Sequence, residues 1–233
     1  MDSTLRRTWA EIDMDALAHN YETLRKRIGE NVKFLGVVKA DAYGHGSVQV
    51  SRLLQESGAD YLAVSSIDEA VELRHNGITM PVLILGHTPK EEVSELIKNN
   101  ITQAVTCRAK ALEYSEEAVK CGGTLKIHIK VDTGMSRLGF PVAKESVEEI
   151  LKIGRLVYTD CEGMFTHFSK ADETDKTTTL EQIRAFLWMK EHLAAEGMEF
   201  TYYHCANSAS IIDMPKLGMN LERAGISTYG LYP

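Results

Sequence analysis

The sequence predicts a TIM-type (β/α)8 barrel, in which eight parallel strands form a ring and helices pack around it. Short apolar segments rich in β-forming residues alternate with segments of helical periodicity along the chain, a pattern typical of parallel strands joined by crossover helices. Eight such strand segments can be counted. The length of 233 residues and the hydrophobic content of 44% suit one barrel domain with a sizeable core.

The elements follow from the periodicity in chain order. The first helix is expected over residues 15–28, because four apolar side chains recur on one face: Leu17, Tyr21, Leu24 and Ile28. Further helices are expected over residues 47–57, 108–121, 142–153 and 179–195, with a short one over 208–214. Strands are expected near residues 33–38, 60–65, 81–86, 102–106, 125–131, 161–166, 200–205 and 218–223.

Two more helix starts have the capping-box pattern, a hydroxyl residue followed three positions later by glutamate. Ser66 with Glu69 fits it, and so does Thr88 with Glu91. Pro89 would occupy the first helical position of the second helix. The helix that precedes the first strand is expected to fill the place usually taken by a helix after the eighth strand, so that the ring can close.

Composition excludes several classes of function. The net charge of -7, the pI near 5.6 and the absence of a dense Lys/Arg cluster argue against nucleic acid or an acidic membrane surface as a partner. The longest apolar runs, such as residues 82–85, are far too short to span a bilayer, and the N-terminus has no apolar leader. A cytoplasmic protein is expected. The four cysteines are scattered without metal-like spacing, so no metal is implied.

Lys39 is the residue that most directly indicates chemistry. It follows the apolar run of residues 34–38 and precedes residues 40–46, which are expected to form a glycine-rich loop. This places an amine at the end of a buried strand. Apolar surroundings favour the free amine, the form that attacks an aldehyde to make a Schiff base. Many lysines at strand ends only extend to water.

Four separated blocks resemble the alanine racemase family. They are Trp9-Ala10-Glu11-Ile12-Asp13; the pyridoxal-phosphate (PLP) lysine motif Val37-Val38-Lys39-Ala40-Asp41-Ala42-Tyr43-Gly44-His45-Gly46; Lys130-Val131-Asp132-Thr133-Gly134-Met135-Ser136-Arg137-Leu138-Gly139; and His204-Cys205-Ala206-Asn207-Ser208 with Arg223-Ala224-Gly225-Ile226. The resemblance implies a PLP-dependent racemase whose barrel is followed by a C-terminal β-domain, with homodimers as the full-length form.

The resemblance also implies domain boundaries. Residues 8–13 alternate like a strand, so residues 1–14 are expected to be a strand-like segment leading from the β-domain. Residues 15–226 are expected to form the barrel, and residues 227–233 an exit segment toward the C-terminal domain. The chain is therefore expected to be the N-terminal barrel without that β-domain, with little activity by itself.

The site residues implied by the resemblance lie at or beyond strand ends, which meet at one mouth of a barrel. Lys39 would hold PLP covalently and move the α-proton on one face of the substrate. The remaining cofactor contacts would be made by the Tyr43 and Ser208 hydroxyls, by backbone N–H groups at Gly225 and Ile226, and by Asn207.

Arg223 resembles the family arginine that faces the pyridine nitrogen of PLP. An arginine stays protonated and cannot hand its proton to the ring, so the cofactor would be a weaker electron sink and would favour racemisation over transamination. Arg137 resembles the arginine that contacts the PLP phenolate and the substrate carboxylate. Lys130 matches a lysine that can be carbamylated, and His167 a histidine near the catalytic pair; both can equally be structural.

The leading functional hypothesis is an alanine racemase that interconverts L- and D-alanine for cell-wall precursor supply. Alternatives are a serine racemase of the same family, a non-enzymatic PLP-binding homeostasis protein built on a single barrel, and a PLP-dependent decarboxylase or aldolase. In the family, the second base is a tyrosine from the C-terminal domain of the partner subunit. His45, His87 and His204 are expected only to orient or pack.

Overall fold

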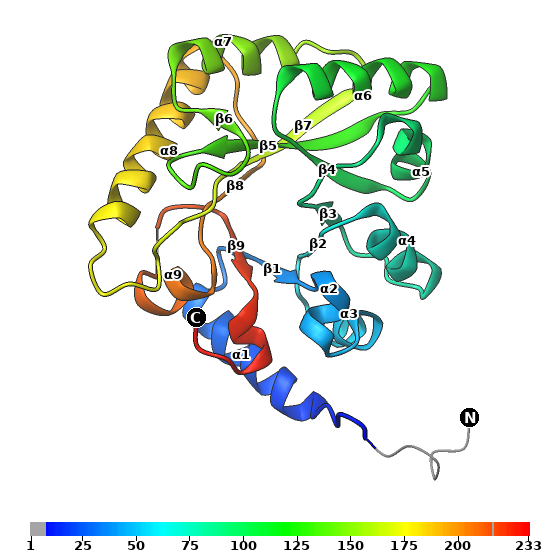
Figure 1. The fold of residues 1–233 in the computed structure, drawn as a ribbon, viewed down its shortest axis with the longest axis vertical. Coiled ribbons are helices and arrows are strands. Elements are labelled where there is room, and N and C mark those ends of the chain that lie inside the picture. The colour runs from blue at the N-terminus through cyan, green and yellow to red at the C-terminus, as the bar shows by residue number, and fades with distance from the viewer. Residues whose placement is uncertain (1–7, 216) are drawn as a thin grey trace.

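The computed structural model describes residues 8–215 and 217–233. Parallel strands form a nearly closed ring, and the helices lie outside it (Figure 1). Around the ring the order is β8, β7, β5, β4, β3, β2, β1, β9. These strands span Tyr202–His204, Thr159–Phe165, Leu125–Asp132, Ile101–Val105, Val82–Ile84, Tyr61–Val64, Lys33–Val37 and Leu221–Ala224. The predicted (β/α)8 barrel and its eight strands are confirmed.

The helices also fall close to their expected places. They are α1 (Met14–Ile28), α2 (Lys39–Gly44), α3 (Ser47–Glu56), α4 (Ile67–His75), η2 (Lys90–Glu92), α5 (Val93–Lys98), α6 (Arg108–Cys121), α7 (Lys144–Ile153), α8 (Thr177–Ala195), α9 (Ser208–Asp213) and η3 (Ile226–Tyr229). The apolar face of α1 is buried as predicted. Near its middle α1 contacts η3, where the Asn20 side chain donates to the carbonyl of Thr228 at 3.2 Å.

Between β8 and β9 the ring is closed in part by a side chain. No strand ladder joins these two strands in the described residues. Instead, the Asn220 carbonyl oxygen accepts from the backbone N–H of Tyr203 at 2.8 Å, and its amide donates to the carbonyl of Thr201 at 2.7 Å. The Asn220 amide group thus takes the place of a backbone pair at the amino end of β9, and closer to the cavity the backbone N–H of Arg223 donates to the carbonyl of Ala206 at 3.3 Å.

The interior of the barrel is divided into an apolar half and a polar half. Strands β1 to β4 supply most of the apolar interior: Leu35, Val37, Tyr61, Ala63, Leu83 and Ala104. Strands β5, β7, β8 and β9 supply five ionisable side chains: His128, Lys130, Glu162, His204 and Arg223. In β5 the polar residues occupy alternate positions and the isoleucines between them face the helices, as the two-residue period of a strand requires.

Three expectations about local structure were wrong. Residues 8–13 form no strand; strand-like alternation makes a strand only where a neighbour completes the backbone hydrogen bonds, and none of the described residues pairs with this segment. Residues 1–7 lie outside the described residues. Thr88 does not cap a helix, since its buried hydroxyl donates to Gln103 at 2.6 Å. The third concerns α2, which is described with the site below.

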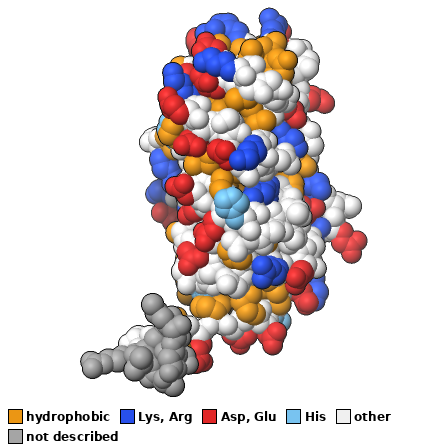
Figure 2. Space-filling model, turned by 90° about the vertical axis from the view of Figure 1, so that its right-hand side faces the viewer, with side chains coloured by type: hydrophobic (Ala, Val, Ile, Leu, Met, Phe, Trp, Pro, Cys, Tyr) orange, Lys and Arg blue, Asp and Glu red, His pale blue; other side chains and the backbone are white. Residues whose placement is uncertain are grey.

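The structure also contains a short strand that the sequence pattern did not indicate, β6 (Phe140–Pro141), which pairs with the end of β5. None of the helices within residues 8–215 and 217–233 is long and apolar enough to cross a bilayer. On the face shown in Figure 2, acidic and basic side chains are interspersed.

Candidate active site

A cavity of about 510 Å³ opens at the carboxyl ends of the strands, a size typical of small-molecule sites. All ten residues singled out from the sequence line it: Lys39, Tyr43, Lys130, Arg137, His167, Asn207, Ser208, Arg223, Gly225 and Ile226. Four of these have basic side chains, and the only acidic side chain among the lining residues is that of Asp172. The cavity is therefore suited to an anionic ligand.

Lys39 begins a left-handed helical turn, where the sequence predicts a glycine-rich loop. The four residues that follow it, Ala40 to Tyr43, have φ between 51° and 55° with ψ between 33° and 52°. Left-handed helical backbone costs roughly 1–2 kcal/mol for each non-glycine residue, and such strain is concentrated at functional sites. The sequence suggested a glycine-rich loop because Gly44 and Gly46 dominate the pattern; the left-handed residues are the four before Gly44.

Two carboxylates hold this turn in place. Glu69, on α4, accepts from the backbone N–H of Ala40 at 2.7 Å and from that of Ser65 at 2.6 Å. Asp41 accepts from the backbone N–H of Ser47 at 2.7 Å. Ser66 caps α4 as predicted, but Glu69 reaches across to the Lys39 segment instead of completing the capping box. These contacts fix the backbone from which Lys39 projects.

The strain makes a prediction about stability. Replacing exposed Ala40 by glycine keeps the backbone N–H that donates to Glu69 and removes the backbone strain of one left-handed residue. The free energy of unfolding is therefore expected to rise by about 1 kcal/mol in urea titrations. The matched control is Ala109→Gly in right-handed α6, where glycine should lower stability by about 1 kcal/mol. An equal loss in both variants would contradict the strained turn.

Three hydrogen-bond donors line the cavity around Gly225: the hydroxyls of Tyr43 and Ser208 and the backbone N–H of Ile226. The hydroxyls of Tyr43 and Ser208 approach Gly225 so closely that a Cβ there would lie 3.2 Å and 3.7 Å from their oxygens. The Ser208 oxygen accepts from the N–H groups of Gly225 and Ser227 at 3.0 Å and 3.2 Å, which leaves its own proton free to donate. Within the described residues, the Ile226 N–H and the Tyr43 hydroxyl have no acceptor. This cradle fits a phosphate group.

Arg223 lies at the base of the cavity with four of its five N–H groups engaged. One terminal nitrogen donates to Nδ1 and to the carbonyl of His204 at 2.8 Å and 3.0 Å, and the other to the carbonyls of Thr166 and Cys205 at 2.7 Å and 3.1 Å. Among the described residues its Nε–H has no acceptor. Burial lowers the pKa of Arg223 to about 10, so the guanidinium remains charged at neutral pH and offers one fixed donor.

Two cavity residues have pKa values shifted by burial. Burial, reinforced by Arg223 and Arg137, lowers the pKa of Lys130 to about 7, and its ammonium donates to the carbonyl of Val131 at 2.8 Å. Burial next to Arg223 lowers the pKa of His167 to about 3. His167 is therefore neutral, and Lys130 titrates near physiological pH.

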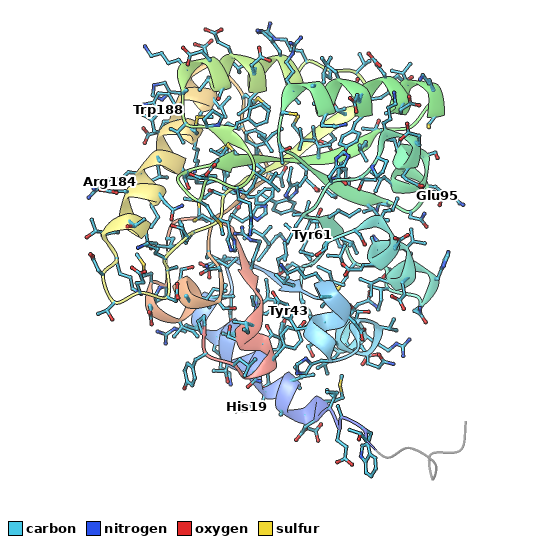
Figure 3. All side chains as sticks on the ribbon, in the orientation of Figure 1. His19, Tyr43, Tyr61, Glu95, Arg184 and Trp188 are labelled. Carbon is cyan, nitrogen blue, oxygen red and sulfur yellow. The ribbon has the colours of Figure 1, made fainter. Side chains whose placement is uncertain are left out.

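The other two predicted residues differ in how firmly they are held. Arg137 lies exposed in the segment between β5 and β6 and makes no hydrogen bond within the described residues, so it is free to reach an anionic group. Asn207 caps α9 in a reciprocal pair with Ser210, which commits its carbonyl oxygen to the helix. Tyr43, on α2, lies beside η3 (Figure 3), with its ring centroid 5.0 Å from that of Tyr229.

Sequence reasoning missed the buried polar residues beneath the cavity. His204 was expected only to orient or pack, and its Nδ1 accepts from Arg223 at 2.8 Å. His128 and Glu162 were not singled out, although they continue the hydrogen-bonded chain from His204. The strict alternation of polar and apolar residues in segment 125–132 was the available signal, because a strand buried on both faces is usually apolar throughout.

The fold and the site together define a TIM-barrel protein with a lysine at the end of its first strand and a cationic cavity facing it. The family model described as "Alanine racemase, N-terminal domain" matches residues 12–233. An alanine racemase of Clostridium tetani is 46% identical over 98% of this chain and 59% of its own length. One of Methanococcus maripaludis is 46% identical over 97% of this chain and 60% of its own length.

Solved structures agree with this match. The alanine racemase of Clostridium difficile 630 superposes with a TM-score of 0.96 at 45% identity, over 98% of this chain and 60% of that one. That of Bacillus anthracis, solved with bound L-Ala-P, gives a TM-score of 0.90 at 35% identity, over 98% and 59%. The chain belongs to the alanine racemase family, and it spans about 60% of the length of these relatives.

Proposed function

We propose that this chain is the cofactor-binding barrel of a PLP-dependent alanine racemase. The observation that carries the proposal is the placement, around one cavity, of the Lys39 amine, an oxyanion cradle at Gly225 and a single free donor on Arg223. PLP has the matching groups: an aldehyde, a phosphate and a pyridine nitrogen. When bound, PLP supplies an electron sink that makes the α-proton of an amino acid acidic.

The residues of the chain have separate roles in this proposal. Lys39 binds the cofactor covalently and then moves the α-proton at Cα on one face of the substrate. Tyr43, Ser208 and the Ile226 N–H bind the phosphate. Arg223 would hold the ring nitrogen through its free Nε–H, and because a guanidinium keeps its proton, the bound cofactor would be a weaker electron sink, which favours racemisation.

The remaining cavity residues recognise the substrate and complete the reaction. Arg137 is positioned to pair with the substrate carboxylate, and neutral His167 lies beside Arg223 with 3.4 Å between Nδ1 and a guanidinium nitrogen. The base for the second face is proposed to come from a tyrosine of a partner copy, in line with the family resemblance. That one relative was solved with L-Ala-P supports alanine as the substrate.

The test is exchange of the α-hydrogen of amino acids with deuterium oxide in the presence of PLP. Because exchange at one face requires only Lys39, we expect deuterium in alanine, monitored by NMR for each enantiomer and accompanied by chiral analysis of the product. L- and D-serine are run in parallel. Preference for serine would change the substrate assignment. PLP binding with no exchange of any amino acid would favour a non-enzymatic PLP-binding protein instead.

Lys130 gives a prediction of its own. A free lysine amine adds to CO₂ and loses one proton to form a carbamate, whose negative charge would be stabilised here by Arg137 and Arg223. The pKa of about 7 makes the free amine available at neutral pH, so ¹³C-bicarbonate should give a carbamate ¹³C signal that increases as the pH rises through 7. Lys130→Arg should lack this signal, and Lys126→Arg, on the same strand, should retain it. A signal that survives in Lys130→Arg would refute the assignment.

A further inference from the structure

A chain of buried hydrogen bonds leads away from Arg223 through the interior of the barrel. Arg223 donates to Nδ1 of His204 at 2.8 Å, Nε2 of His204 lies 2.9 Å from Nδ1 of His128, and Nε2 of His128 lies 3.3 Å from a carboxylate oxygen of Glu162. Both histidines are fully buried. The chain therefore connects the base of the cavity with the opposite end of the barrel, where the Glu162 side chain is 15% exposed.

The chemistry of its two ends fixes the direction of hydrogen-bond donation along the chain, from Arg223 toward Glu162. Arginine has only donors, so His204 must accept at Nδ1 and, being neutral, carry its proton on Nε2. That proton can only be donated to Nδ1 of His128, which therefore carries its own proton on Nε2 and donates it to Glu162. An ionised carboxylate has only acceptors, so Glu162 independently requires the same arrangement.

The protonation states of the two histidines and of Glu162 agree with hydrogen-bond donation that runs from Arg223 toward Glu162. Burial lowers the pKa of His128 and brings that of His204 well below its usual value, so both imidazoles are neutral. Burial alone would raise the pKa of the Glu162 carboxyl. The hydrogen bonds from His128 and Tyr61 and the charge of Lys126 outweigh burial, and the pKa lies below its usual value. Glu162 is thus ionised at neutral pH.

The backbone is shaped to place Glu162 at the end of the chain. The pairing of β5 with β7 shifts register between Ile127 and His128, and this bulge leaves Glu162 without a partner across the ladder. Bulges redirect side chains in this way. The next residue is glycine, and a Cβ on Gly163 would lie 2.6 Å from the imidazole of His128. Only glycine leaves room for that ring.

Other interior residues complete the surroundings of the carboxylate. The hydroxyl of Tyr61 donates to Glu162 at 3.0 Å and lies 2.7 Å from the Thr102 hydroxyl; Tyr61 lies on β2 within the ring of strands (Figure 3). Burying charged and polar groups costs more than packing apolar residues of the same volume. Because this network is costly to bury, we expect it to have a specific role, namely to orient the side chain of Arg223.

We propose that Glu162 is a positioning residue for Arg223. Its negative charge polarises the two imidazoles, so that Nδ1 of His204 accepts strongly from the guanidinium. This holds Arg223 with its remaining Nε–H toward the cavity and offsets part of its positive charge. The effect on the PLP ring nitrogen rests on the proposed function, whereas the direction of the chain does not.

The first measurement needs no cofactor. In protein labelled with ¹⁵N-histidine, His204 and His128 should both show the tautomer protonated at Nε2, with slowly exchanging imidazole protons. Glu162→Gln retains the shape and an accepting oxygen but removes the charge, so the Nδ1 resonances of both histidines should shift. The matched control is Asp160→Asn, which removes the same charge from an exposed position on the same strand; this carboxylate acts on His128 only through its charge, without a hydrogen bond, so the resonances should shift far less than in Glu162→Gln. The opposite tautomer at either histidine would overturn the proposal.

The second measurement uses PLP labelled with ¹⁵N in its ring. With less charge compensation, Arg223 becomes a stronger donor, so in Glu162→Gln the ring ¹⁵N resonance should shift toward the position of a protonated pyridine. Asp160→Asn should match the wild type. A folded Glu162→Gln variant with an unchanged ring resonance would overturn the proposal. Failure of wild-type protein to bind PLP would instead count against the proposed function, and the histidine spectra would still decide the direction of the chain.

Tyr61→Phe provides a second variant in case Glu162→Gln does not fold. It removes one of the two hydrogen bonds to the carboxylate without touching either histidine. With one donor fewer, more of the negative charge of Glu162 acts through His128, so a smaller shift of the ring resonance opposite to that of Glu162→Gln would support the proposal, and no shift would contradict it.

Discussion

Replacing Lys39 by alanine is expected to abolish covalent attachment of PLP while the barrel remains folded. Lys39 is the cavity amine at the end of β1, and its side chain makes no hydrogen bond within the described residues, so its removal costs little stability. PLP added to wild-type protein should give a visible absorbance band. After borohydride reduction, peptide mapping should find the adduct on Lys39. In Lys39→Ala both the band and the adduct should be lost.

The matched control for this experiment is Lys33→Ala. Lys33 lies at the opposite end of the same strand, where it pairs with Asp60 at 3.0 Å, far from the cavity lining. Its loss should leave PLP attachment at the wild-type level and change stability by no more than about 1 kcal/mol, as for other exposed ion pairs. An adduct on any lysine other than Lys39 in wild-type protein would overturn the site assignment.

Arg223→Leu is expected to have the largest effect on stability. The arginine is 4% exposed, and its removal leaves the carbonyls of Thr166 and Cys205 without a donor and His204 without its partner. Removing one member of a buried charged network typically costs about 3–5 kcal/mol, because each unsatisfied buried acceptor retains its desolvation penalty. Urea unfolding without PLP should show this loss.

Arg137→Leu separates stability from function at the same cavity. Arg137 is exposed and unbonded within the described residues, so its replacement should change the free energy of unfolding by no more than about 0.5 kcal/mol. Because it removes a cavity cation, it should still weaken binding of PLP and slow α-hydrogen exchange of alanine. A loss of stability equal to that of Arg223→Leu would show that Arg137 is structural and that its assigned role is wrong.

The site was largely predictable because barrel topology converts sequence positions into spatial neighbours. A residue at the carboxyl end of any parallel strand must face the same mouth, so Lys39 and Arg223 could be brought together although they are far apart in the sequence. Family motifs then supplied roles for individual residues, and these roles remain proposals. What each side chain touches could not be predicted: the capping pattern at Ser66 was correct, but it did not show that Glu69 reaches Ala40.

The sequence by itself determined the barrel, its strands and most of its helices, because the spacing of apolar residues fixes which face of each element is buried. Only the tertiary structure decided three features. The left-handed turn after Lys39 depends on Glu69 from another helix, the closure of the ring depends in part on the Asn220 side chain, and the interior chain from Arg223 to Glu162 depends on a bulge. Each results from contacts between strands and helices that are distant in sequence, and local periodicity contains no information about such contacts.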